Sequence, residues 1–251
     1  MSIASEHPRK GEGGKPSPRA RRLLTAFLLV LVAIFLALGS WQVQRLFWKL
    51  DLIARVESRI HAEPVAAPAR AEWPGIEREK DEYRRVTATG LFRHDRTALV
   101  QAVTERGAGF WVLTPLVLAD DTTILINRGF VPADRSAPEA RLASELAAGP
   151  VVITGLLRMS EPDGGFLRAN DPANGRWFSR DVAAIAAARG LADVAPYFID
   201  ADATPNAGGL PVGGLTVVAF RNSHLVYALT WYALAAMSAF AAWQVHRRRL
   251  V

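Results

Sequence analysis

Cysteine is absent from this chain, and histidine occurs only five times. Without cysteine the chain can form no disulfide, no thiol nucleophile and no cysteine-ligated zinc or iron–sulfur site. The histidines are scattered, and no two of them have the spacing of a metal-binding pair. The sequence also lacks a Gly-rich phosphate loop, a His-Glu-x-x-His motif and a Gly-x-Ser-x-Gly motif. These absences argue against catalysis, and we expect a protein that is not an enzyme.

Basic side chains are concentrated at the two ends of the chain, whose formal net charge is +6. Residues 1–22 carry a net charge of +4, and Arg247, Arg248 and Arg249 add three more positive charges. All the other residues together therefore carry about −1. A duplex-binding domain needs basic groups clustered on its folded part to neutralise phosphates. We therefore expect no nucleic-acid partner, and we interpret the basic ends as signals of membrane topology.

Two long apolar runs lie next to these basic ends. Residues 23–44 and 223–245 contain no Lys, Arg, Asp or Glu, and each run is long enough to cross a lipid bilayer. Residues 1–22 are predicted to be a disordered basic tail and residues 246–251 a second basic tail, both of them cytoplasmic. Ala37-Leu38-Gly39 also has the pattern of a signal-peptide cleavage site. The length of the first run and the presence of a second one favour an uncleaved span.

Residues 45–222 are predicted to form one extracytoplasmic domain. Apolar residues at helical spacing predict that the first span continues as an amphipathic helix to about residue 60. Further helices are predicted at 138–148 and 181–189, the second capped by Asp181. Runs of β-branched and aromatic residues predict strands at 83–92, 97–104, 109–118, 122–127, 151–159, 196–200 and 215–221. The expected fold is α+β, with two transmembrane helices flanking a mainly antiparallel β domain for which a barrel is one possible form.

The sequence Asn127-Arg128-Gly129 lies at the end of one predicted strand. It is open to two interpretations. The first is a bulge or turn in which Gly129 adopts a positive φ and Arg128 pairs with a carboxylate of the domain. The second is a docking site with an exposed Arg128, and Asn127, Arg128 and Arg221 are our candidates for contact with a partner.

His224 lies at the start of the second apolar run, with Tyr227 and Trp231 on the same face of the predicted helix. One interpretation is an aromatic belt at the membrane interface, with the histidine reaching water. The other is a binding face for a flat hydrophobic cofactor. Imidazole is a haem ligand, and small residues such as Ala228 and Ala235 leave room for a ring system. The residues alone leave both interpretations open.

Several short motifs follow one another along the chain. They are Gly39-Ser40-Trp41-Gln42, Thr114-Pro115-Leu116, Ile126-Asn127-Arg128-Gly129-Phe130-Val131-Pro132, Gly155-Leu156-Leu157-Arg158, and Arg221-Asn222 followed by His224-Leu225, Tyr227-Ala228 and Thr230-Trp231. In this order, and between two apolar spans, they resemble the surfeit-locus protein 1 family of cytochrome c oxidase assembly factors. Phe130 and Phe178 depart from the family pattern, which more often has Trp and Tyr at these positions.

The resemblance implies a membrane-anchored assembly factor that binds haem a and assists its insertion into oxidase subunit I. It implies His224 as the ligand of the haem iron, with Tyr227 and Trp231 lining the ring. The expected partners are subunit I, haem a synthase and the lipid bilayer. The expected location is the bacterial inner membrane, with the main domain in the periplasm. The alternative is a haem-independent chaperone that clamps a folding oxidase subunit through its spans and the Asn127–Pro132 loop.

Overall fold

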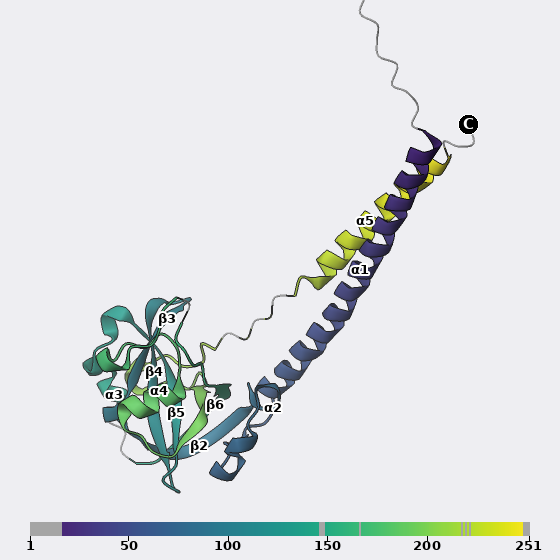
Figure 1. The fold of residues 1–251 in the computed structure, drawn as a ribbon. Helices are drawn as coiled ribbons and strands as arrows, with labels where there is room; N and C mark the ends of the chain where they lie inside the picture. Colours follow the sequence, from purple (N-terminus) through teal and green to yellow (C-terminus); the bar gives the residue numbers. More distant parts are fainter. Residues whose placement is uncertain are drawn as a thin grey trace, which may run out of the picture. The chain divides into compact units, whose positions relative to one another are not determined.

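The chain divides into two compact units, which we call the helical unit (Met1–Ile53 with Phe220–Val251) and the barrel unit (Ala54–Ala219). The structure is a computed structural model that describes residues 17–145, 149–165, 167–216, 218, 220 and 222–247 (Figure 1). Most of both predicted tails lies outside the described residues, as does the candidate docking residue Arg221.

Helix α1 (Pro18–Ile60) begins at a well-formed cap. The backbone N–H of Ala20 donates a hydrogen bond to Ser17 Oγ at 3.2 Å. Pro18 occupies the first helical position, where its missing N–H leaves no bond unmade. The helix therefore starts five residues before the predicted span and includes part of the predicted tail. No further proline occurs before Pro64, which follows the end of the helix.

Helix α5 (His224–Arg247) runs antiparallel to α1 within the helical unit. The guanidinium of Arg21 donates to the Val245 carbonyl at 3.3 Å near one end of the pair. Small residues at seven-residue intervals form the buried face of α5, namely Ala228, Ala235 and Ala242. Gly39 of α1 has the same effect, since a Cβ at this position would lie 2.8 Å from the Tyr232 ring. Small side chains thus allow the two helices to approach closely.

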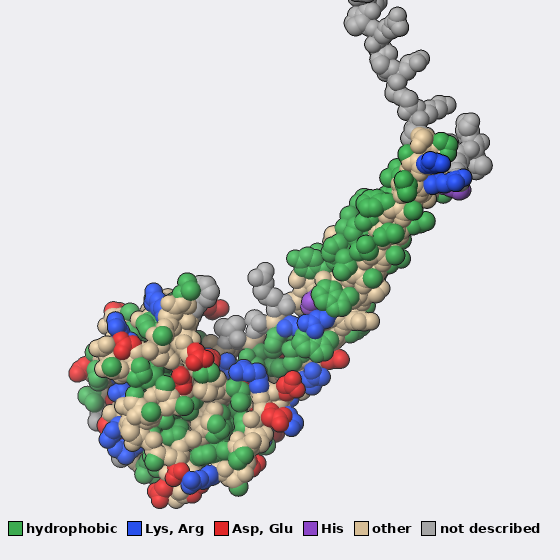
Figure 2. Space-filling model, in the orientation of Figure 1, with side chains coloured by type: hydrophobic (Ala, Val, Ile, Leu, Met, Phe, Trp, Pro, Cys, Tyr) green, Lys and Arg blue, Asp and Glu red, His purple; other side chains and the backbone are tan. Residues whose placement is uncertain are grey.

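Both helices are long and apolar enough to cross a membrane. Large hydrophobic side chains along both remain exposed, including Phe27, Val30, Leu229 and Phe240. Figure 2 shows a long stretch of hydrophobic side chains along these helices, with Lys and Arg at the end where α1 begins and again toward the other end of α1. An exposed apolar surface of this extent is typical of helices that face lipid.

The barrel unit is built on a seven-stranded sheet with the strand order β1-β2-β6-β7-β5-β4-β3. Its strands are β1 (Val65–Ala66), β2 (Arg85–Phe92), β3 (Ala98–Thr104), β4 (Gly107–Leu118), β5 (Thr123–Pro132), β6 (Val151–Met159) and β7 (Val194–Ala201). Strand β2 also pairs with the end of β4, which closes β2, β6, β7, β5 and β4 into a barrel-like ring. Among the described strands, only β1–β2 and β5–β7 pair in parallel. The predicted α+β class with a mainly antiparallel, barrel-like sheet is thus confirmed.

Two hydrophobic cores lie on opposite faces of this sheet. Ile124, Ile126 and Ile199 belong to the first core, which fills the barrel. The intervening residues Leu125 and Phe198 point the other way, into a second core that includes α4 (Val182–Arg189). Alternating side chains of β5 and β7 therefore serve both cores. This double burial explains why apolar residues in these strands follow one another without polar interruption.

The connections show where sequence patterns succeed and where they fail. Asp120 and Asp121 form the tight turn between β4 and β5, and Asp181 caps α4 through its bond to the Ala184 N–H, both as predicted. The predicted helix at 138–148 is a 3-10 turn, Pro138–Arg141, followed by α3 (Leu142–Glu145), while 146–148 lie outside the described residues. A further short helix, α2 (Arg78–Asp81), precedes β2. The predicted strand at 215–221 is absent at residues 215, 216, 218 and 220, none of which pairs with a strand, while 217, 219 and 221 lie outside the described residues.

Candidate functional site

His224 is the first residue of α5 and is half-buried. Its Nδ1 lies 2.8 Å from Oε1 of Gln42 on α1. An amide oxygen can only accept a hydrogen bond, so in this arrangement Nδ1 carries the proton. The lone pair is then on Nε2. This is the arrangement in which a histidine that is oriented by one ring nitrogen ligates a metal through the other.

Gln42 is a site residue that sequence patterns did not single out. It lies 182 residues from His224 in the chain, so no local pattern connects the two. The available signal was its place in the Gly39-Ser40-Trp41-Gln42 motif, where a polar side chain follows a long apolar run. Its neighbour Ser40 pairs with the Tyr232 hydroxyl at 3.3 Å. This part of α1 thus supplies polar partners to two residues of α5.

Tyr227 and Trp231 share a helix with His224 but lie in different surroundings. The Trp231 ring stacks on Phe35 of α1, with 5.7 Å between ring centroids and 26° between the ring planes. Tyr227 is 54% exposed. The structure therefore holds Trp231 against α1 and leaves Tyr227 on the open surface of the helix pair. The other described histidine of this unit, His246, lies at the opposite end of α5.

These residues fit a single imidazole ligand for a haem iron. One ring nitrogen is held by Gln42, the other has its lone pair available, and Tyr227 and the stacked Trp231 follow on the same helix. The exposed side chains of Leu225 and Tyr227 leave this face of the helix open to a flat group. Ala228, in contrast, is only 2% exposed and leaves no room for a ring system, contrary to the prediction. Elsewhere in the described residues, no three His, Asp or Glu side chains gather into a metal-binding cluster.

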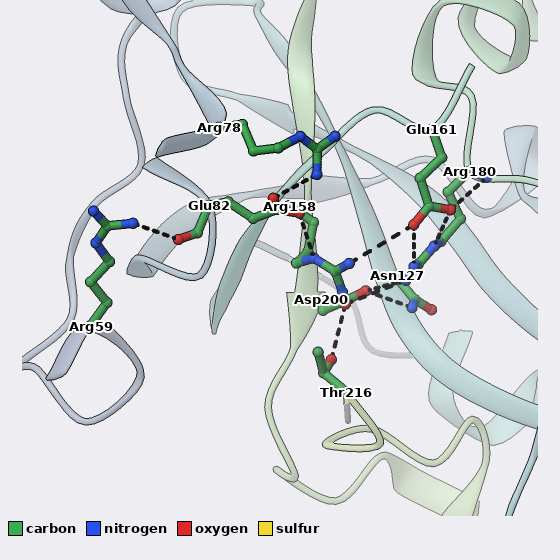
Figure 3. A network of polar contacts seen from close by, with 9 residues as sticks. All are labelled: Arg59, Arg78, Glu82, Asn127, Arg158, Glu161, Arg180, Asp200 and Thr216. Carbon is green, nitrogen blue, oxygen red and sulfur yellow. Dashed lines mark hydrogen bonds and ion pairs between the residues drawn. The ribbon is translucent and has the colours of Figure 1, made fainter. Parts of the chain in front are cut away.

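The barrel unit contains a second group of polar residues, which we call the Asp200 network (Figure 3). Asp200 on β7 is 3% exposed. Its carboxylate accepts hydrogen bonds from Asn127 Nδ2 at 2.7 Å, Arg158 Nη1 at 2.8 Å, Thr216 Oγ1 at 2.9 Å and Arg180 Nη1 at 3.2 Å. The network thus ties β5, β6 and β7 to the two segments that contain Arg180 and Thr216.

Both arginines of the Asp200 network also pair with other carboxylates. Arg180 binds Glu161 with two N–H groups, and Arg158 reaches Glu82 at 3.4 Å. Burial alone would raise the pKa of Glu161, but the hydrogen bonds and charge of Arg180 outweigh it and hold that pKa below its ordinary value. Every guanidinium in this group therefore has a carboxylate partner. This arrangement suits a structural clamp better than a site with a reactive group.

Asn127 and Arg128, two of the candidate docking residues, are both 4% exposed. Asn127 uses both ends of its amide inside the barrel unit, since Oδ1 accepts from the Gly129 N–H and Nδ2 donates to Asp200. The docking interpretation required an exposed Arg128, and this expectation is wrong. The predicted carboxylate pair is wrong too, because no carboxylate among the described residues lies within 4.0 Å of its guanidinium. The bulge interpretation is confirmed, since Arg128 and Gly129 together oppose Val112 of β4.

Comparison with known proteins identifies the family. The sequence profile of the SURF1 family matches residues 29–236. Surfeit locus protein 1 of Mus musculus is 39% identical over 241 residues, which cover 89% of this chain and 76% of the mouse protein. Surfeit locus protein 1 of Homo sapiens is 38% identical over 232 residues, covering 85% and 74%, and a SURF1-like protein of Monosiga brevicollis is 38% identical over 247 residues, covering 93% and 90%. The chain therefore belongs to the SURF1 family, the cytochrome c oxidase assembly factors that its sequence motifs resemble.

Proposed function

We propose that this protein is a membrane-anchored assembly factor that binds haem a through His224 and assists its insertion into subunit I of cytochrome c oxidase. The observation that carries the proposal is the hydrogen bond between His224 Nδ1 and Gln42, which leaves Nε2 as the ligating nitrogen. Family membership supports the role in oxidase assembly. SURF1 proteins are assembly factors rather than enzymes, and we propose no catalytic residue.

The helical unit supports a place in the membrane. Its two helices are apolar enough to span a bilayer, and basic residues flank the ends that carry the termini. Positive flanks favour the cytoplasmic side, which puts both termini in the cytoplasm and the barrel unit in the periplasm of a bacterial inner membrane. His224 would then lie at the outer end of α5. A haem delivered laterally through the bilayer could reach it there.

In this proposal, four residues of the chain have separate roles in binding haem. His224 would hold the iron, Gln42 would fix the tautomer and orientation of its ring, and Tyr227 and Trp231 would contact the porphyrin. Haem a, when bound, supplies the redox-active iron that the mature oxidase needs. Haem a synthase is the expected donor and subunit I the expected acceptor. A hydrophobic cofactor passed between membrane proteins in this way avoids release into water.

The central test is the visible spectrum of the purified protein. The full chain is co-expressed with the enzymes of haem a biosynthesis and purified in detergent. We expect the parent protein to carry haem and His224→Ala to lose at least about nine-tenths of it, because the only proposed protein ligand to the iron is removed. His246→Ala is the matched control, since it removes a histidine from the other end of the same helix and should retain haem.

Retention of haem by His224→Ala at the parent level would refute ligation by this residue. Co-purification with subunit I that is unchanged when haem a synthesis is blocked would instead support the haem-independent chaperone. These results are distinguishable because the first is measured as the haem absorbance of the purified protein and the second as the amount of subunit I that co-purifies with it.

Gln42 offers a separate prediction for the same site. Gln42→Leu removes the partner of His224 Nδ1 and leaves the imidazole in place. We expect haem affinity to fall about 10- to 100-fold, because residues that orient a ligating histidine typically contribute that much. The measurement is a haem titration in detergent followed by absorbance. Gln44→Leu, a nearby glutamine on the same helix, is the control, and equal affinities for the two variants would contradict an orienting role for Gln42.

A further inference from the structure

Arg128 is a buried cation whose hydrogen-bond partners are all neutral. Its guanidinium donates to the Ser144 carbonyl at 3.0 Å and to Asn206 Oδ1 at 3.2 Å, and it lies 3.3 Å from His94 Nδ1. The Phe92 ring lies under it, with 4.9 Å between Cζ and the ring centroid. These groups hold the guanidinium in one orientation but do not neutralise its charge.

Three other arginines of the barrel unit that are buried or largely buried do have a carboxylate partner. Arg141, Arg158 and Arg180 each have a carboxylate within 4.0 Å, and among the described residues Arg128 does not. A buried charge without a counter-charge is unfavourable. Burial accordingly lowers the pKa of Arg128 to about 10, which still leaves it charged at neutral pH. The charge of Glu145 offsets part of this effect, but none of the described carboxylates pairs directly with Arg128.

Arg128 faces a cavity of about 450 Å³. The cavity is lined on one side by β2 and β6, and on the other by α3 and the segment around Asn206. Phe92 and Ile153 contribute apolar wall, and His94, Ser144 and Asn206 contribute polar groups. Two further lining residues, Leu91 and Val152, are 50% and 67% exposed. A small ligand fits this volume, and a few fixed polar groups among apolar walls are typical of ligand sites.

The charges around the cavity indicate what it would hold. Of the charged residues that line the cavity, Arg128 is positive and Glu145 and Asp202 are negative, and Arg141, which lies outside the lining, pairs with Glu145 at 3.3 Å. Burial, followed by the charge of Arg128, lowers the pKa of His94, so that this ring is neutral at pH 7. Because Arg141 neutralises Glu145, Arg128 and Asp202 remain, and their charges sum to zero. Arg128 is the one cation of the described lining and favours an anion, and a singly charged carboxylate meets less repulsion from Glu145 and Asp202 than a phosphate monoester, which carries about two negative charges.

We propose that this cavity, the Arg128 pocket, binds a carboxylate, which pairs with the guanidinium of Arg128 and lies beside His94. Both hydrogens of Arg128 Nη2 are already donated to Ser144 and Asn206, so the carboxylate would accept from the hydrogens that remain on Nη1 and Nε. The carboxylate can come from a free organic acid or from an acidic side chain of a partner protein. The exposed Leu91 and Val152 beside the opening give an acidic peptide additional surface to contact.

The first test uses the parent protein alone. The full chain, with labelled histidine, is titrated in detergent with sodium acetate at constant ionic strength, against sodium chloride. We expect saturable movement of the His94 ring signals, with a Kd of about 10 mM or tighter, and a rise in the pKa of His94 because a negative charge now lies beside it. The signals of His94 are identified by their loss in His94→Gln. The charges that face this ring are Arg128, Arg141, Glu145 and Asp95, none of which acetate replaces.

The second test removes the cation. Arg128→Met keeps most of the side-chain volume, and acetate should no longer move the His94 signals or raise the thermal midpoint of the variant. Arg106→Met, on the exposed β3–β4 turn, is the matched control and should respond like the parent. If Arg128→Met fails to fold, the titration of the parent still decides the proposal.

Two comparisons identify the source and the chemistry. A blocked pentapeptide with one Glu between Val and Leu residues is compared with its Gln counterpart. Binding of the Glu peptide at least about tenfold tighter than acetate supports a protein partner, and equal affinity supports a free acid. Inorganic phosphate that binds more tightly than acetate would overturn the carboxylate assignment. A linear, unsaturated response to acetate, or an undiminished response in folded Arg128→Met, would overturn the site itself.

Discussion

Replacing Asp200 with asparagine is expected to lower the free energy of unfolding of the barrel unit by about 3 kcal/mol. The carboxylate is almost fully buried and accepts hydrogen bonds from two arginines. Removing one member of a buried ion pair leaves the other charge uncompensated, which typically costs about 3–5 kcal/mol. We expect the lower end of that range, because Arg158 keeps Glu82 and Arg180 keeps Glu161.

The measurement is urea unfolding of the full chain in mild detergent, followed by tryptophan fluorescence, since Trp111 and Trp177 both lie in the barrel unit. Asp193→Asn is the matched control. Asp193 pairs with Arg70 at 2.7 Å, but both side chains are about half exposed, so its loss should cost at most about 1 kcal/mol. Asparagine also tolerates the positive φ of 48° at this position. Equal losses in the two variants would contradict a stabilising role for the Asp200 network.

The Asp200 network also shows what a sequence conceals. Asn127, Arg158, Arg180 and Asp200 lie on separate elements, and only the sheet pairing brings them together. Asn127 and Asp200 meet because β5 and β7 pair in parallel, with these two residues directly opposite. A parallel pair formed by strands about 70 residues apart leaves no local signal. The strands could be predicted from their residues, but their neighbours could not.

Residue patterns were informative wherever local physics decides the structure. The apolar runs correspond to two long helices, and the turn and capping residues Asp121 and Asp181 lie where their side-chain chemistry favours them. The segment from Leu215 was misread because β-branched residues such as Thr216 also occur outside strands. There, the hydroxyl of Thr216 donates to Asp200, a buried acceptor on β7. Tertiary context thus overrides the local preference for a strand.

The candidate haem site was predictable in part for a similar reason. His224, Tyr227 and Trp231 share one helix, so their common face follows from helical spacing. Their different surroundings do not, because Phe35 and Gln42 come from α1. The burial of Arg128 was equally hidden, since a polar residue at a strand end is more often exposed. In both cases the sequence does not show which other segment packs against the residue, namely α1 at the haem site and the segments around Ser144 and Asn206 at Arg128.

Gly129→Ala is expected to be the other strongly destabilising substitution, with a loss of about 4 kcal/mol. Gly129 has a φ of 130°, a conformation that side chains other than glycine rarely adopt. A Cβ here would lie 2.1 Å from the Val212 carbonyl oxygen, which is backbone and cannot turn aside. The two hydrogen bonds that join Phe130 and Val212, each of 2.9 Å, would then have to open. Urea unfolding as above measures the loss.

Gly107→Ala separates backbone strain from the clash, because Gly107 has a φ of 97° but no neighbouring segment within 4 Å of the position that a Cβ would occupy. We expect it to lose only about 1–2 kcal/mol, the part due to strain. An equal loss in both variants would show that contact with Val212 is not the cause.

The substitution at Gly129 should also affect the Arg128 pocket, because Asn206 accepts a hydrogen bond from the Arg128 guanidinium and donates one to the Pro211 carbonyl. Displacement of the Pro211–Val212 segment therefore moves a group that orients Arg128, and Gly129→Ala, but not Gly107→Ala, should weaken acetate binding.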